Sequence, residues 1–202
     1  MNKLTIDALK NAVKYSIALS ILFGTQIVWA VPVLDKEVQN FIPDGHTVLV
    51  YQTADLNGDG RQDAILVFES NIAEISIQQP RTLMILLRDN QEHLSVAEQN
   101  NEVFFCKACL GTTYETYQDV KVKKNTFSVS NEGGGVRYRW NNEFVFKYSL
   151  HYKTWLLSRV NISIKDISQS KLIRRQSLTY PNDLKKIRLS KFTAQVSWRS
   201  TP

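Results

Sequence analysis

The sequence is poor in the residues from which most zinc sites and thiol-dependent sites are built. Its 202 residues include only two cysteines, Cys106 and Cys109, and three histidines. A structural zinc site takes four Cys or His ligands at characteristic spacings. His46, His93 and His151 stand at no such spacing from the cysteines or from one another. The scattered histidines also leave no preferred Ser/His/Asp order, so the sequence indicates neither a zinc site nor a catalytic constellation.

Long apolar runs are also missing, and this limits the ways in which the chain can meet a membrane. The apolar stretch at residues 17–23 is shorter than the roughly 20 residues that span a bilayer. Three lysines precede it within residues 3–14, and Val28-Trp29-Ala30 follows it, as in a secretory signal peptide. We expect residues 1–30 to be a signal peptide cleaved after Ala30, with export to the periplasm or the extracellular space. An uncleaved anchor and a buried helix are the alternatives.

The positive charge is concentrated near the C-terminus. The formal net charge is +6, yet residues 31–170 carry 14 basic against 17 acidic residues, whereas residues 171–202 carry eight basic residues against Asp183 alone. This basic C-terminal segment is suited to an acidic protein or an anionic envelope polymer, and we expect no nucleic-acid partner. A solvated face that complements the acidic body is the simpler interpretation.

The rest of the chain predicts one mostly β domain at residues 31–202, without internal repeats or a low-complexity linker. Alternating or short apolar runs are typical of strands. They occur at residues 46–52, 64–68, 82–87 and 94–97, with a hairpin turn at residues 89–92 between the last two.

The clearest strand follows Gly133-Gly134-Gly135. From Val136 to Tyr148 one face is mainly aromatic, and the other is mainly charged or polar and interrupted only by Val145. Such a pattern is typical of a sheet with one face on the core. We expect residues 155–160 to be its hairpin partner.

The remaining elements are weaker. Residues 127–129 and 192–196 predict short strands, and residues 161–180 predict either a long excursion or a loosely attached pair of strands. Helix is scarce: residues 34–41 predict two turns, and Asn182 is placed to cap a turn at residues 183–187. The expected fold class is mainly β (α+β is possible), an antiparallel sheet domain with a short N-terminal helix.

One loop carries a cation-binding pattern. In Asp55-Leu56-Asn57-Gly58-Asp59-Gly60-Arg61-Gln62-Asp63, oxygen-bearing side chains occupy positions 1, 3, 5 and 9. Ca²⁺ takes six to eight hard oxygen ligands, and the two glycines permit the backbone angles of a tight coil. The alternative is an Asn-Gly/Asp-Gly turn without metal.

This loop resembles those of the FG-GAP (integrin-α-like) and VCBS repeats, Asp-x-Asn-Gly-Asp-Gly-x-x-Asp followed by an apolar strand. It differs from an EF-hand because position 12 is Leu66 rather than Glu. The resemblance implies Ca²⁺ held by Asp55, Asn57, Asp59, the backbone carbonyl of Arg61, and Asp63. It covers about thirteen residues in a single copy, so the family's propeller is not implied.

A second resemblance concerns three stretches together. This loop, Phe105-Cys106-x-x-Cys109 and Gly134-Gly135-x-x-x-Arg139-Trp140 resemble the combination found in uncharacterised exported bacterial proteins. That resemblance implies no activity.

Cys106 and Cys109 suit an oxidising compartment, in which they would pair. A small structural disulfide is our expectation, since Leu110-Gly111-Thr112-Thr113 does not resemble the helix start of a redox motif. A redox-active cysteine pair and a metal-binding pair are the alternatives.

Taken together, the residues predict an exported calcium-binding protein that is a binding or interaction module rather than an enzyme. An envelope enzyme or enzyme inhibitor with an unrecognised site is one alternative, and a thiol-disulfide redox protein using Cys106 and Cys109 is the other.

Overall fold

The computed structural model describes residues 34–71, 80–105 and 118–194. The chain divides into two units, Met1–Val31 and Pro32–Pro202, and every described residue belongs to the second. No helix among the described residues is long and apolar enough to cross a bilayer.

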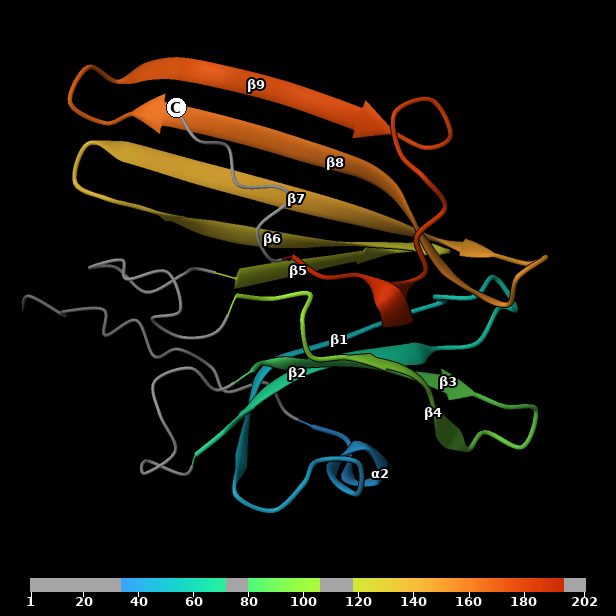
Figure 1. The fold of residues 1–202 in the computed structure, drawn as a ribbon. Coiled ribbons are helices and arrows are strands. Elements are labelled where there is room, and N and C mark those ends of the chain that lie inside the picture. The colour runs from blue at the N-terminus through green and yellow to red at the C-terminus, as the bar shows by residue number, and fades with distance from the viewer. Residues whose placement is uncertain (1–33, 72–79, 106–117, 195–202) are drawn as a thin grey trace, which may run out of the picture. The chain divides into compact units, whose positions relative to one another are not determined.

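The described residues form two antiparallel sheets, ordered β1-β2-β3-β4 and β5-β6-β7-β8-β9 (Figure 1). The mainly β, antiparallel fold class is therefore confirmed. The elements are α2 (Lys36–Gln39), β1 (His46–Ala54), β2 (Asp63–Ser70), β3 (Thr82–Arg88), β4 (Leu94–Asn100), β5 (Gln118–Lys123), β6 (Thr126–Gly134), β7 (Tyr138–Ser149), β8 (Thr154–Asp166), β9 (Lys171–Thr179) and the 3-10 turn η2 (Leu189–Lys191).

The first sheet is covered on both faces, which explains why β2 and β3 are apolar without alternation. On one face, Ile65 and Val67 of β2 join the main core with residues of the second sheet. On the other, Leu66 and Phe68 join a smaller cluster with Val38 of α2. Figure 1 shows α2 on the side of this sheet that faces away from β5–β9.

The second sheet has one face on the core and one face open to solvent. Phe144 and Phe146 of β7 are fully buried, whereas Lys147 between Phe146 and Tyr148 is exposed. The aromatic face predicted from the sequence is therefore the core face. The strand itself begins at Tyr138, because Val136 lies outside the ladder and is 80% exposed.

Several strands are longer than their sequence patterns predict. The partner of β7 is β8, which continues through Asn161 to Asp166 with alternating burial. The long excursion predicted for residues 161–180 is therefore wrong, whereas the alternative of a pair of strands is correct: their first part belongs to β8 and most of the remainder forms β9, which pairs with it. The predicted strand at residues 127–129 extends over Gly133 and Gly134 as β6, and β5 was not predicted at all.

The predictions for helical elements and for the last strand differ from the structure. The two turns expected at residues 34–41 are not confirmed, since α2 is a single turn of four residues. The turn expected at residues 183–187 is wrong, because Asp183 instead bonds back to Thr179 and the carbonyl of Ile187 accepts from Leu157 N–H of β8. The strand expected at residues 192–196 is also wrong for its described part, residues 192–194, which follow η2 without pairing in a sheet.

A candidate calcium loop between the two sheets

The candidate loop, residues 55–63, connects β1 to β2 and is wound around the carboxylate of Asp55. Gly58 N–H donates to Asp55 Oδ1 at 2.6 Å, and Gly60 N–H donates to Asp55 Oδ2 at 3.1 Å. Both glycines have φ in the left-handed region, 86° and 90°, which side chains disfavour. The two glycines thus let the backbone curl until its N–H groups face one carboxylate.

The side chains of Asn57 and Asp59 also accept hydrogen bonds from main-chain N–H groups of the loop. Asp59 N–H donates to Asn57 Oδ1 at 3.0 Å, and Arg61 N–H donates to Asp59 Oδ1 at 2.9 Å. The Asn57 amide also donates to Asp59 Oδ2 at 2.8 Å. Oxygen atoms at every second residue therefore organise the backbone, as expected for short Asx side chains in turns.

Asp63 closes the loop and is fully buried. Its Oδ2 accepts from Leu56 N–H at 2.8 Å, and its Oδ1 accepts from Arg88 N–H of β3 at 3.0 Å. Burial raises the pKa of Asp63 above its ordinary value, and the negative charges of Asp59 and Asp55 add to the rise. The last Asp of the motif is therefore tied to the sheet as well as to the loop.

The second sheet holds the other side of the loop. Leu56 is fully buried in the main core, and its carbonyl accepts from the indole N–H of Trp155 at 3.2 Å. The carbonyl of Asp55 accepts from Asn125 N–H, in the turn between β5 and β6, at 2.9 Å. The carbonyl of Asn125 accepts from Tyr148 N–H of β7 at 2.8 Å. The loop is thus a junction between the sheets, fixed by hydrogen bonds to its main-chain carbonyls.

Two cationic side chains form ion pairs with carboxylates of the loop. Lys124 Nζ is 3.2 Å from Asp55 Oδ2, and Arg61 Nη2 is 2.6 Å from Asp59 Oδ2. Burial pushes the pKa of Asp59 upward, but the bonds from Arg61 and Asn57 outweigh it, so the net pKa is lowered. At Tyr148, burial and the negative charges of Asp59, Asp63 and Glu98 raise the pKa. Negative charges of the loop thus act on Tyr148 of β7, while Lys124 and Arg61 neutralise part of them.

The loop offers oxygen donors of the type that Ca²⁺ prefers, although its carboxylates are not gathered around a common point. Among the described residues, His, Cys, Asp and Glu side chains nowhere form a group of three that could hold a metal. Hard oxygens are nevertheless the ligands that Ca²⁺ prefers. One further oxygen lies against the loop. Asn125 Oδ1 is buried, has no hydrogen-bond partner among the described residues, and would lie 2.5 Å from a Cβ built on Gly58.

The sequence motif identified Asp55, Asn57, Asp59, Arg61 and Asp63, which the structure places in one loop. It missed Lys124 and Asn125, because nothing in their local sequence connects them to a loop more than sixty residues earlier. Cys106 and Cys109 lie outside the described residues, so both the disulfide and the redox alternative stay predictions.

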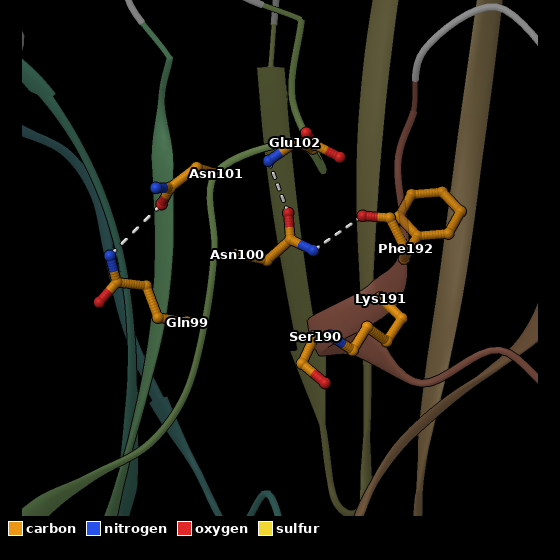
Figure 2. A pocket seen from close by; sticks show the side chains of 7 residues that line it. All are labelled: Gln99, Asn100, Asn101, Glu102, Ser190, Lys191 and Phe192. Atoms are coloured by element: carbon orange, nitrogen blue, oxygen red, sulfur yellow. Dashed lines mark hydrogen bonds between the residues drawn. The ribbon is translucent and has the colours of Figure 1, made fainter.

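A polar hollow of about 460 Å³ lies between residues 99–102, at the end of β4, and residues 190–192 (Figure 2). Asn100 at its centre is 7% exposed. Its amide donates to the carbonyls of Leu189, at 2.6 Å, and Phe192, at 2.9 Å, and its Oδ1 accepts from Glu102 N–H at 2.6 Å. The hydrogen-bonding groups of Asn100 are therefore engaged in holding η2 against the first sheet.

Comparison with known proteins adds no relative. No protein-family model matches the chain, and neither the curated proteins nor the solved structures contain a match to it.

Proposed function

We propose that the chain is an exported calcium-binding module, a binding rather than a catalytic protein, in which Ca²⁺ stabilises the junction between the two sheets. The observation that carries the proposal is the position of the loop: Asp55 and Leu56 are bonded to the second sheet, while Asp63 is bonded to the first. A cation bound by the loop would therefore stabilise its contacts with both sheets.

The residues that would hold the ion are those of the motif. They are Asp55, Asn57, Asp59, the backbone carbonyl of Arg61, and Asp63. In the described structure Lys124 and Arg61 neutralise part of the loop's charge. Ca²⁺ would replace these two contacts, and the exposed lysine side chain would move back into solvent at little cost. Lys124 is thus expected to lower the calcium affinity by competing for Asp55.

The test is thermal unfolding in Ca²⁺ and in EDTA. Binding to the folded state alone stabilises it by about 2.7 kcal/mol when free Ca²⁺ is a hundredfold above Kd. We expect a higher Tm in Ca²⁺ that Asp55→Ala and Asp59→Ala abolish. Asp119→Ala is the matched control, because Asp119 also pairs with a lysine, at 3.5 Å, but lies on β5 outside the loop. It should leave the calcium response intact.

Isothermal titration of Lys124→Ala measures the competition directly. We expect tighter Ca²⁺ binding by this variant than by the parent chain. Identical melting curves of the parent chain in Ca²⁺ and EDTA would mean that residues 55–63 form only a turn.

A further inference from the structure

The last strand of the second sheet, β9, has one edge that no described strand covers. It pairs with β8 along its length and ends the sheet order. Its nine residues include two exposed apolar side chains, Leu172 at 41% and Ile173 at 46%. An uncovered edge presents backbone N–H and C=O groups to which another strand can pair.

The bonds at the end of β9 fix which of these groups point outward. Thr179 N–H donates to the Asp183 carboxylate, and Thr179 C=O accepts from Asp183 N–H, so both point away from β8. Tyr180 N–H, one residue later, donates to Ser158 of β8. Because backbone groups alternate sides along a strand, those of Ser177 and Arg175 also point away from β8. No described residue bonds to them.

The edge is strongly basic. Lys171, Arg174 and Arg175 lie on β9, which carries no acidic residue, and none of the three is paired with a carboxylate among the described residues. Register places Arg175 opposite Ser163, on the solvent face that also carries Arg159 and Lys165 of β8. Because Arg174 and Arg175 are adjacent, they lie on opposite faces of the sheet, and a strand added beside β9 would have a basic side chain next to it on each face.

We propose that the edge of β9 that no described strand covers, its free edge, binds an extended acidic segment of a partner protein by strand addition, with the backbones of Arg175 and Ser177 supplying the hydrogen bonds. Main-chain bonds would give the affinity, and alternating acidic side chains on the face of the sheet that carries Arg175 would give the selectivity. This proposal does not depend on the calcium loop.

A second copy of the chain is the less suitable occupant. Antiparallel pairing of two β9 strands over Arg175–Ser177 would bring Arg174 and Arg175 of one copy close to the same residues of the other. Like charges on neighbouring strands are destabilising. The bulge at Ile173, where Lys165 pairs with Leu172 and Ile164 with Arg174, confines regular pairing of any added strand to the Arg175–Ser177 part of the edge.

The experiment measures binding of the full chain to a fluorescent nine-residue peptide in which Glu alternates with Val. We expect binding that weakens as ionic strength rises. A fully N-methylated peptide of the same sequence keeps the charges but has no N–H groups, and it should not bind. Arg175→Gln should bind several-fold more weakly than the parent chain and with a smaller salt dependence.

Two variants of Ser177 separate backbone pairing from charge. Ser177→Ala and Ser177→Pro both lose the hydroxyl bond to Asn161 (2.8 Å), but only the proline removes the outward N–H. Melting curves establish that both are folded. We expect the alanine variant to bind like the parent chain and the proline variant to bind on the order of tenfold more weakly.

Equal binding by the two variants, or tight binding of the methylated peptide, would refute strand addition. Self-association of the parent chain would identify a second copy as the occupant. If the parent chain binds no peptide and Arg175→Gln self-associates, the charges only protect the edge and the proposal is wrong.

Discussion

The contact between the loop and the second sheet can be measured with two glycines of the loop that have similar φ angles but different neighbours. Gly58 and Gly60 share a left-handed φ, and an alanine at either position would be strained by roughly 1–2 kcal/mol. A Cβ at Gly60 meets no atom within 4 Å, whereas one at Gly58 meets Asn125 Oδ1 at 2.5 Å. The difference in stability between Gly58→Ala and Gly60→Ala therefore reports the close approach of Asn125.

The extra cost at Gly58 is limited because the obstructing atom ends a short side chain that can rotate. Forcing a side chain away from its rotamer costs about 0.5–1.5 kcal/mol. We therefore expect Gly60→Ala to lower the free energy of unfolding by about 1–2 kcal/mol and Gly58→Ala by about 1 kcal/mol more. Adding Asn125→Gly to Gly58→Ala should recover most of that difference, since it removes the obstructing side chain and tolerates the φ of 59° at this position.

The assay is urea unfolding followed by tryptophan fluorescence, with EDTA present so that calcium binding does not contribute. Trp155, one of four tryptophans in the chain, is buried and bonded to Leu56, so its surroundings change when the junction is lost. Equal destabilisation by Gly58→Ala and Gly60→Ala, or no recovery in the double variant, would contradict the close contact between Asn125 and the loop.

Two further outcomes are expected. Burial raises the pKa of Glu98 above its ordinary value of 4.5, and its Oε2 has no hydrogen-bond partner among the described residues. The folded state therefore binds the proton more tightly, and stability falls as pH rises from 4.5 through the raised pKa. Glu98→Gln keeps an acceptor for the Thr154 hydroxyl and should gain up to about 1 kcal/mol at neutral pH but little at acidic pH, by denaturant unfolding at both. A gain that is the same at both pH values would contradict this reasoning. The exported chain should begin at Val31 by N-terminal sequencing, and retention of Met1 would contradict cleavage.

The strands that the sequence predicted well are those whose burial is uniform along a face. In β2 the run around Leu66 is apolar because both faces are covered, and in β7 the alternation around Phe144 follows from one covered face. β9 carried a weak signal because an edge strand buries little: its first five residues are all exposed. Periodicity reports burial, so it identifies central strands more readily than edges.

The errors near the C-terminus have a different cause. Asn182 and Asp183 suit a helix start, but Asp183 satisfies the backbone of Thr179 instead, and Ile187 bonds to β8. Short polar side chains offer the backbone alternatives to a helix. Phe192 was read as part of a strand, yet it is a single anchor, with its ring 4.8 Å from Phe144 and 5.2 Å from Phe146.

For the candidate site, the sequence could predict the coil but not its surroundings. Asp55, Asn57 and Asp59 accept hydrogen bonds from main-chain N–H groups a few residues later, so these contacts are local and follow from the spacing of the motif. Lys124 and Asn125 approach only because β5 and β6 return to this end of the sandwich, as the bond between Gln52 and Val120 and the bond between Asn125 and Asp55 require. Long-range neighbours of this kind depend on the order of the strands in the sheets, and the residue pattern within a strand does not predict that order.

The calcium loop and the free edge of β9 contact different parts of the second sheet. The loop is bonded to the turn between β5 and β6 and to Trp155 at the start of β8, whereas β9 pairs with β8 only from Arg159 onward. A ligand can shift an equilibrium only through contacts that differ between two states, and Ca²⁺ at Asp55 would make no contact with β9. Peptide binding at Ser177 should therefore be the same in Ca²⁺ and in EDTA wherever the chain is folded. Any dependence would mean that the five-stranded sheet changes as a unit when the junction is ordered, and by reciprocity the peptide would then alter calcium affinity by the same factor.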